Sequence, residues 1–297
     1  MNATDQLVRP SANAEVIEAW DGPLFDRFAQ YRHIVVGGLS RYGGEAMRLN
    51  RPPAGGRALD IGCGFGDTSR QLADLVGADG SVLGLDASPR FIEAARSEAL
   101  DSGVRNLRFE VADVETATLP DRFDLAFSRF GTMFFANPVA ALRNIRRALV
   151  PGGQLVMVVW RVKAENEWLY RAQTITERFL TKPEEYDAPT CGPGPFSMAN
   201  ADTLSGILIS AGFDAITLRR CDLPIMIGRD IDEAVEFTMS LGPAGEILRL
   251  AGDRAAHLHK PVADALREGL ADWVGAEGVI APSSTWIVTA ASPDTGA

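Results

Sequence analysis

The first half of the chain alternates between two patterns of apolar and polar positions. Segments of strand length that are rich in apolar residues occupy residues 58–61, 81–86, 107–111, 123–127 and 154–160. Between these runs, apolar residues recur at the spacing of a helix that buries one face. This helical pattern is found in residues 67–76, 89–99 and 138–149. Strands that alternate with helices predict a doubly wound α/β fold, in which a parallel sheet is covered on both faces.

The two ends of the chain are predominantly helical in pattern. Residues 14–49 precede the first strand and predict helices within residues 1–50. A stretch rich in Pro and Gly at residues 182–198 is typical of a loop or gate. We expect residues 51–297 to form one α/β domain, with helical insertions at about 161–200 and 230–283 that make a cap. The strands of this second half are expected at residues 215–227 and 285–290.

A glycine-rich turn follows the first predicted strand and contains the most specific pattern in the sequence. Gly62, Gly64 and Gly66 alternate with other residues directly before a predicted helix. Glycine allows a backbone to approach a ligand closely, and the N–H groups of the following helix point into the same space. The turn therefore predicts a binding site for a small molecule.

Acidic residues around this turn narrow the choice of ligand. Asp60 precedes the glycines and Asp67 begins the helix, and two carboxylates would repel the pyrophosphate of a dinucleotide. Asp86 ends the second strand about 20 residues further on, which is the spacing of a carboxylate that binds ribose hydroxyls. Asp113 and Ser128 also follow strands. Because ligands of such sheets bind at the carboxyl ends of the strands, we expect these side chains to line one site.

Four segments in this order resemble the class I S-adenosylmethionine-dependent methyltransferases, in the branch similar to quinone-biosynthesis C-methyltransferases. The matching segments are Leu59-Asp60-Ile61-Gly62-Cys63-Gly64-Phe65-Gly66, Gly84-Leu85-Asp86-Ala87-Ser88, Ala112-Asp113-Val114 and Leu149-Val150-Pro151-Gly152-Gly153. The resemblance covers residues 57–160. It implies a Rossmann-like sheet of seven strands, with the last strand antiparallel and inserted beside the fifth. It also implies S-adenosylmethionine as cofactor and S-adenosylhomocysteine as product.

The resemblance assigns cofactor-binding roles to particular residues. Asp60 would lie near the ammonium group, and Asp86 would accept hydrogen bonds from the ribose hydroxyls. The remaining assignments concern the amino-acid part, the adenine and the methionine side of the cofactor. The amino-acid part would be held by Gly62, Cys63 and Gly64. The adenine would contact Ala87, Asp113 and Val114, and the methionine side would be lined by Ser128 and Met133.

The resemblance also implies that the N-terminal helices of residues 1–50 fold over the cofactor as a lid. Candidate catalytic residues lie in this lid and after the fourth strand. His33 would act as a general base if the acceptor must lose a proton. Arg129 would hold a carboxylate or enolate of the acceptor. We see no spacing of ligands typical of a metal site. The expected reaction is methyl transfer to an O, N or C atom of a small hydrophobic or aromatic acceptor. Two alternatives remain: a non-catalytic S-adenosylmethionine sensor or partner protein, and a nicotinamide oxidoreductase.

Composition limits the partners. The 297 residues carry a formal net charge of −10, whereas proteins that bind nucleic acid usually present a basic face. We therefore expect a small-molecule partner and no nucleic acid. No apolar run approaches the length of a membrane span, and the three cysteines suggest no disulfide framework. These features predict a cytoplasmic protein, and the sequence leaves its oligomeric state open.

Overall fold

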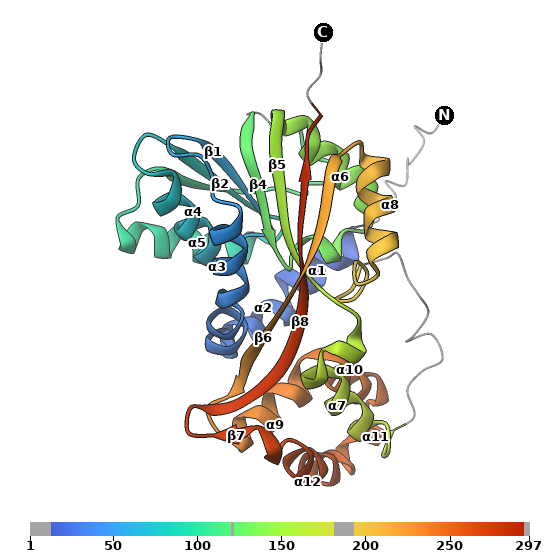
Figure 1. Cartoon of the computed structure of the whole chain (residues 1–297). Coiled ribbons are helices and arrows are strands. Elements are labelled where there is room, and N and C mark those ends of the chain that lie inside the picture. Colours follow the sequence, from blue (N-terminus) through green and yellow to red (C-terminus); the bar gives the residue numbers. More distant parts are fainter. Residues whose placement is uncertain (1–12, 120–121, 181–192, 294–297) are drawn as a thin grey trace, which may run out of the picture.

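A single sheet forms the centre of the molecule (Figure 1). The structure is a computed structural model that describes residues 13–119, 122–180 and 193–293. The strands of the sheet lie in the order β3-β2-β1-β4-β5-β8-β6. They are β1 (Arg57–Ile61), β2 (Ser81–Asp86), β3 (Leu107–Val111), β4 (Phe123–Arg129), β5 (Leu149–Trp160), β6 (Asp214–Gly228) and β8 (Gly278–Ala291).

The directions of the strands confirm the predicted fold class. Strands β1 to β5 pair in parallel, and β8 runs antiparallel to both of its neighbours, β5 and β6. The last strand is thus antiparallel and inserted beside the fifth, as predicted. A two-residue strand, β7 (Val274–Gly275), pairs with β8 and adds an eighth strand to the seven expected.

Helices cover both faces of the sheet. Helices α4 (Asp67–Val76) and α5 (Pro89–Ser102) connect β1 to β2 and β2 to β3, whereas α6 (Pro138–Ala148) connects β4 to β5. Crossovers between parallel strands are right-handed. The connections through α4 and α5 run along the sheet in one direction, and the connection through α6 runs in the other. Helix α6 therefore lies on the face opposite to α4 and α5. The strand order reverses between β1 and β4, which is where such sheets bind ligands.

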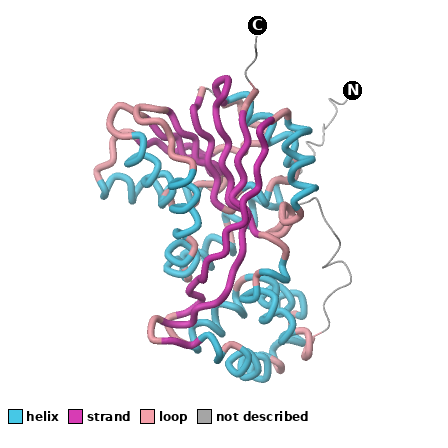
Figure 2. The backbone as a smooth tube through the Cα atoms, viewed as in Figure 1, coloured by secondary structure: helices cyan, strands magenta, loops and turns pink. Residues whose placement is uncertain are grey.

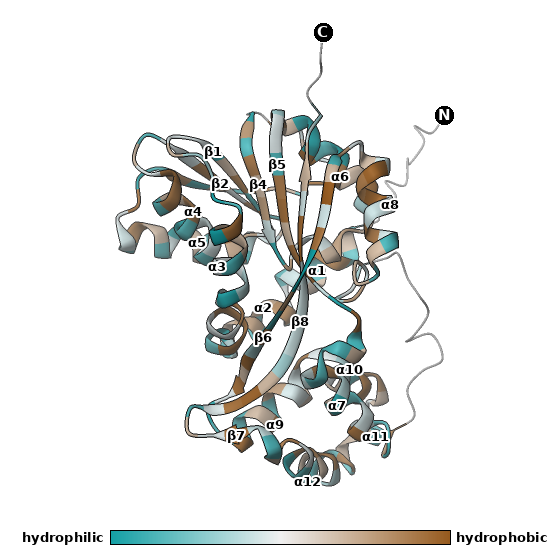
Figure 3. Cartoon of the chain, in the orientation of Figure 1, coloured by the Kyte–Doolittle hydropathy of each residue, from teal (hydrophilic) through white to brown (hydrophobic). Residues whose placement is uncertain are grey.

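The core lies along the central strands. Phe127 on β4 and Leu155 and Val158 on β5 have no exposed surface. Figure 3 shows the hydrophobic colour concentrated on the strands between the helical layers. Strands buried on both faces are expected to be continuously apolar, which explains why the sequence pattern located them.

Strands β6 and β8 are longer than the others and leave the sheet as a two-stranded ribbon (Figure 2). Their pairing extends from Asp214 opposite Ala291 to Gly228 opposite Val279. The far end of the ribbon holds a group of helices that we call the cap. It comprises α7 (Glu167–Thr176), α9 (Ile231–Ser240), α10 (Gly242–Ala251), α11 (Asp253–Ala256) and α12 (His259–Gly269). Helix α7 packs against α10 and α12, so segments on either side of β6 in the sequence meet here.

The helices before β1 lie between the sheet and the cap (Figure 1). We call this part the lid segment. It consists of α1 (Ala14–Asp21), α2 (Pro23–Gln30), a π-helical turn η1 (His33–Gly38) and α3 (Ser40–Leu49). Helix α1 contacts α5, η1 contacts β6, and α3 contacts β5 and β6. The lid segment therefore touches both halves of the sheet.

Some predicted boundaries differ from the structure. Strand β5 begins at Leu149 instead of residue 154, because Leu149 already pairs with Phe123. Strand β8 begins at Gly278 instead of residue 285, because the ribbon extends its pairing with β6. Helix α8 (Ala201–Ala211) has the predicted bounds. The predicted gate at residues 182–198 lies largely outside the described residues. Within those residues, no helix is long and apolar enough to cross a membrane.

Candidate functional site

The glycine-rich turn after β1 brings two loops into contact. Gly62 and Gly64 adopt φ values of +66° and +53°, a conformation that favours glycine. A Cβ atom on Gly62 would lie 3.0 Å from the Cα of Gly131, in the turn after β4. Glycine at this position therefore allows the loops that follow β1 and β4 to meet at the point where the strand order reverses.

Asp86 links the end of β2 to this turn. Its Oδ2 accepts a hydrogen bond from the Gly64 N–H at 2.9 Å, and its Oδ1 accepts one from the Ser88 N–H at 3.0 Å. Burial raises the pKa of the carboxyl, and these backbone donors act against that shift. A carboxylate has about four acceptor sites, so both oxygens keep capacity for a ligand's hydroxyl groups.

Asp60 lies beneath the turn, with 1% of its surface exposed. The hydroxyl of Ser69 donates to its Oδ2 at 2.6 Å. Burial raises the pKa of Asp60 to about 7, while Ser69 and the charge of Arg129 oppose the shift. Cys63 is also buried, and its desolvation raises the pKa of the thiol. The thiol is therefore protonated and packs as a small apolar group.

Asp67 at the start of α4 is neutralised by two arginines. Arg70 contacts it at 2.7 Å and Arg32 of the lid segment at 3.2 Å, and Arg32 also pairs with Glu98. The argument that Asp67 repels a pyrophosphate is therefore weaker than the sequence suggests. Asp86 supplies a better argument against a pyrophosphate, because its carboxylate accepts the hydrogen bond of the Gly64 N–H that a phosphate would need.

The lid segment covers the ends of β2 and β3. Asn13 donates to the Oδ1 of Asp113 at 3.1 Å. Asp21 accepts from the Ser88 hydroxyl at 2.6 Å and from the Arg90 N–H at 3.0 Å. The other residues predicted to contact adenine lie in the same region: Ala87 is half-buried, and Val114 is buried. The adenine side of the predicted site is thus closed by the N-terminal helices.

Ser128 and Met133 are buried beneath the loop after β4. The Ser128 hydroxyl donates to the carbonyl of Ile61 at 2.8 Å and has no exposed surface. The Met133 sulfur accepts from the Trp160 N–H at 3.4 Å, and 1% of this residue is exposed. Met133 belongs to the short helix η2 (Thr132–Phe134). The polar atoms of both side chains are occupied by the protein itself.

Arg129 ends β4 as a half-buried cation. Desolvation lowers the pKa of its guanidinium, while the charges of Asp67 and Asp60 oppose the shift. Within residues 13–119, 122–180 and 193–293, its side chain forms no hydrogen bond or ion pair. A guanidinium has five N–H donors, so Arg129 is available to an anionic ligand at the reversal point of the sheet.

A chain of aromatic side chains begins next to Arg129 and reaches the cap. Phe130, at φ +63°, stacks on Trp160 with ring centroids 4.3 Å apart. Trp160 contacts Trp168 of α7 at 5.8 Å, and Trp168 lies parallel to Phe237 of α9 at 6.0 Å. Phe237 then contacts Tyr31 of the lid segment at 5.3 Å. We call these five residues the aromatic wall.

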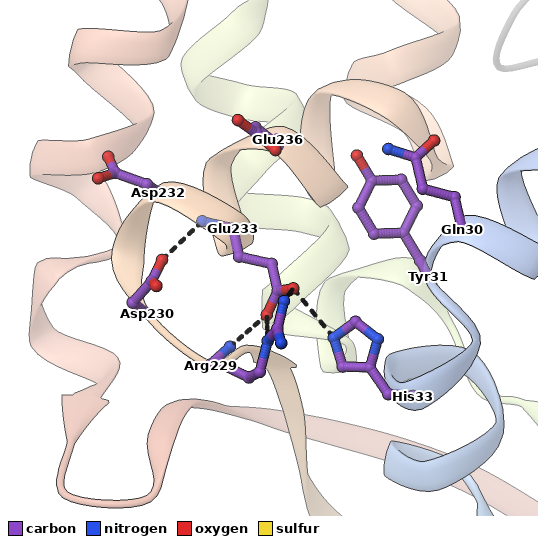
Figure 4. Close-up of a pocket in the computed structure, with 8 residues that line it drawn as sticks. All are labelled: Gln30, Tyr31, His33, Arg229, Asp230, Asp232, Glu233 and Glu236. Carbon is purple, nitrogen blue, oxygen red and sulfur yellow. Dashed lines mark hydrogen bonds and ion pairs between the residues drawn. The ribbon is translucent and has the colours of Figure 1, made fainter.

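The structure brings His33 to the cap and does not show it beside the predicted cofactor residues. Its Nε2 lies 3.1 Å from the Oε1 of Glu233 on α9, which is also bound by Arg229 (Figure 4). Hydrogen bonding by Arg229 contributes most to lowering the pKa of Glu233 to about 2. These residues line a surface pocket of about 470 Å³. His33 thus joins the lid segment to the cap.

Several residues of this region carried no distinctive sequence signal. Trp160, Trp168 and Phe237 occur in apolar patterns that are the same for core and ligand-lining residues. Asn13 and Asp21 gain their roles only by folding back onto strand ends far along the chain. Among the described residues, no group of three or more His, Cys, Asp or Glu is arranged to hold a metal ion.

Comparisons with known proteins agree with this geometry. A model of the family described as "Methyltransferase domain" matches residues 53–201. Aklanonic acid methyltransferase DauC from Streptomyces sp. (strain C5) is 34% identical over 146 residues, which cover 49% of this chain and 64% of that relative. The ubiquinone/menaquinone biosynthesis C-methyltransferase UbiE from Pseudomonas fluorescens (strain Pf0-1) is 30% identical over 197 residues, covering 62% of this chain and 75% of that protein.

Solved structures show the same fold at low sequence identity. A putative methyltransferase from Bacillus halodurans C-125 superposes with a TM-score of 0.54 at 16% identity, covering 84% of this chain and 98% of the other. Phosphoethanolamine N-methyltransferase 2 from Haemonchus contortus, solved with S-adenosyl-L-methionine, superposes with a TM-score of 0.52 at 18% identity. The match covers 95% of this chain and 57% of the other. Family match, relatives and fold agree, and this chain belongs to the S-adenosylmethionine-dependent methyltransferases.

Proposed function

We propose that this enzyme transfers a methyl group from S-adenosylmethionine to an O, N or C atom of a small hydrophobic or aromatic acceptor. The observation that carries the proposal is the aromatic wall, which begins at Phe130, next in sequence to Arg129, and continues into the cap. Arg129 has no hydrogen bond or ion pair within the described residues. Flat apolar molecules gain binding energy from aromatic side chains through buried area and ring contacts. An acceptor held there would lie over the ends of β4 and β5.

The residues at the ends of β1 to β3 fit the cofactor. Asp86 retains acceptor sites for ribose hydroxyls, and the turn through Gly62, Cys63 and Gly64 has the close backbone approach that the amino-acid part needs. Asp60 would balance the ammonium group, and Ala87, Asp113 and Val114 would bound the adenine. Bound S-adenosylmethionine would supply the electrophilic methyl group. Ser128 and Met133 would act by shaping the loop beside it, since their polar atoms are already bonded.

Arg129 would hold an anionic oxygen of the acceptor. Its guanidinium is half-buried, unpaired within the described residues and adjacent in sequence to the first ring of the aromatic wall. Fixing that oxygen orients the acceptor atom toward the methyl donor, and such positioning is a large part of catalysis. The relatives' names fit this chemistry, because one names an acid and the other names quinones.

The role of His33 as a general base stays a prediction. Its Nε2 is engaged by Glu233, so a proton would have to be taken by the Nδ1 atom. The same contact gives His33 a second role, in which it holds the lid segment against the cap. Membership of a methyltransferase family favours an enzyme over the sensor alternative and argues against a nicotinamide oxidoreductase.

A transfer assay with radiolabelled S-adenosylmethionine tests the proposal. The panel would contain 1-naphthol, 4-hydroxybenzoate and reduced 1,4-naphthoquinone as aromatic acceptors, with phosphoethanolamine and duplex DNA as acceptors of other classes. We expect label on at least one aromatic compound and its loss in Asp86→Ala, with Asp79→Ala as an exposed control. Labelling only of phosphoethanolamine or DNA, or of nothing, would contradict the proposed acceptor class.

A further inference from the structure

Trp168 has a buried indole N–H without a partner. Its residue is 8% exposed, and its Nε1 has no hydrogen-bond acceptor among the described residues. Trp286 shows the usual situation, because its Nε1 donates to the Ala199 carbonyl at 3.0 Å. Buried tryptophan N–H groups normally find an acceptor, since a buried donor that makes no hydrogen bond is unfavourable. The exception at Trp168 therefore needs an explanation.

Two of the other unpartnered atoms among the described residues have a simpler explanation. The Nε of Arg161 and the Oε2 of Glu165 belong to side chains that already pair with each other at 2.8 Å. The indole N–H is the only polar group of Trp168 and is a donor only. The missing partner must therefore supply an acceptor atom.

The position of Trp168 indicates where that partner would come from. The indole lies between Trp160, at the carboxyl end of β5, and Phe237 of the cap. It is the middle member of the aromatic wall, where the strand end meets α7 and α9. Thr132 of η2, two residues beyond Phe130 in sequence, also has a buried hydroxyl with no hydrogen-bond partner among the described residues. Within the described residues, Trp168 is thus the member of the aromatic wall whose side chain has a buried donor without an acceptor.

We infer that Trp168 is a specificity residue whose indole N–H donates a hydrogen bond to a ring oxygen of the methyl acceptor. This inference rests on the proposed function and deepens it. The acceptor is then a planar aromatic molecule that carries a carbonyl or hydroxyl oxygen on its ring, apart from the anionic oxygen held by Arg129. The rings of the wall select its flat apolar body, and Trp168 rejects molecules without the oxygen.

A matched pair of neutral probes isolates this hydrogen bond. The compounds 1-tetralone and tetralin share one fused-ring skeleton, and only the first has an oxygen. Their binding to the full chain loaded with S-adenosylhomocysteine would be measured by calorimetry for the wild type, for Trp168→Phe and for the control Trp286→Phe. Phe keeps one ring, removes the N–H and also loses volume, so tetralin, which has no oxygen, reports any effect of the lost volume alone.

We expect the wild type to bind 1-tetralone about three- to tenfold more tightly than tetralin, the usual net effect of one hydrogen bond. Trp168→Phe should lose this preference while it still binds tetralin and S-adenosylhomocysteine. Its smaller ring leaves space in the core, so the variant should unfold at a lower temperature than the wild type. A wild type that does not distinguish the two probes, or a variant that still does, would overturn the inference. Trp286→Phe should retain the preference.

A second measurement does not depend on how the variant folds. The protein contains five tryptophans, so its ¹⁵N-labelled indole groups give a small set of NMR signals, and the variant identifies that of Trp168. Addition of 1-tetralone, but not of tetralin, should move this signal downfield. An unchanged signal at saturating 1-tetralone contradicts the inference. Failure of S-adenosylhomocysteine to bind the wild type contradicts the proposed function instead, so the two failures are distinguishable.

Discussion

The Ser69 hydroxyl donates to the carboxylate of Asp60 at 2.6 Å, inside the protein, where 1% of Asp60 is exposed. This one hydrogen bond does not compensate the loss of water, and the pKa of Asp60 rises from 3.8 to about 7. Asp60 is therefore partly protonated near neutral pH in the free enzyme. A cationic ligand nearby would favour its ionised form.

This raised pKa predicts a specific pH dependence. The folded state binds the proton more tightly than the unfolded state, so the contribution of Asp60 to stability is complete below pH 3.8 and is lost as the pH rises to about 7. The free energy of unfolding of the wild type should fall, relative to Asp60→Asn, by a few kcal/mol over this window, on the order of 1.4 kcal/mol per pH unit at most. Urea denaturation of both proteins at several pH values measures the difference.

The same carboxyl should release a proton when S-adenosylmethionine binds. If the ammonium group lies near Asp60, its charge lowers the pKa of Asp60, so affinity rises as the pH approaches 7. Calorimetry in buffers of different ionisation enthalpy counts the released protons. Equal proton release by the wild type and Asp60→Asn would show that Asp60 does not face the ammonium.

Arg129 should affect the acceptor more than the cofactor. Replacing its unpaired guanidinium in Arg129→Gln removes a charge-assisted hydrogen bond, which is worth roughly 1.5–3 kcal/mol and corresponds to an acceptor KM about 10- to 100-fold higher. Arg129→Lys should restore part of the loss. The exposed Arg147→Gln is the control. A large loss of S-adenosylmethionine affinity with an unchanged acceptor KM would assign Arg129 to the cofactor's carboxylate.

His33→Ala separates the two roles considered for this residue. If His33 mainly holds the lid segment against the cap, loss of its contact with Glu233, where 38% of the His33 side chain is exposed, should leave kcat within about threefold of the wild type and moderately raise the acceptor KM. The exposed His257→Ala should change neither. A general base contributes about 10²- to 10⁴-fold, so a loss of that size in kcat, together with a changed pH profile, would establish the catalytic role.

Tyr42 should be important for stability. It is fully buried on α3, and its hydroxyl lies 2.6 Å from the Ser283 Oγ and donates to the Leu223 carbonyl at 3.0 Å. Burial raises its pKa to about 12, so it remains neutral. Tyr42→Phe removes these hydrogen bonds, whereas Ser283 still donates to the Leu223 carbonyl at 2.7 Å. The variant should lower the free energy of unfolding by about 0.5–1.5 kcal/mol in urea denaturation. The exposed Tyr170→Phe should have little effect.

The sequence predicted those parts of the molecule whose residues are close together in the chain. The glycine turn, the strand-end residues Asp86 and Asp113, and helices α4 and α8 depend on local pattern, and their elements lie where expected. Contacts across long separations could not be predicted. His33 with Glu233 and Asn13 with Asp113 form only when the lid segment folds onto other elements. Trp168 has the pattern of a core residue, and only its unpartnered N–H distinguishes it.

Calorimetric titration with S-adenosylmethionine, S-adenosylhomocysteine and NADH tests the central claim most directly. Wild type and the exposed control Asp79→Ala should bind both sulfur ligands in the micromolar range and should not bind NADH. Asp86→Ala removes two acceptor oxygens for the ribose, which should weaken both sulfur ligands about 100-fold. Binding of NADH, no binding of the sulfur ligands, or equal affinities in Asp86→Ala would contradict the account.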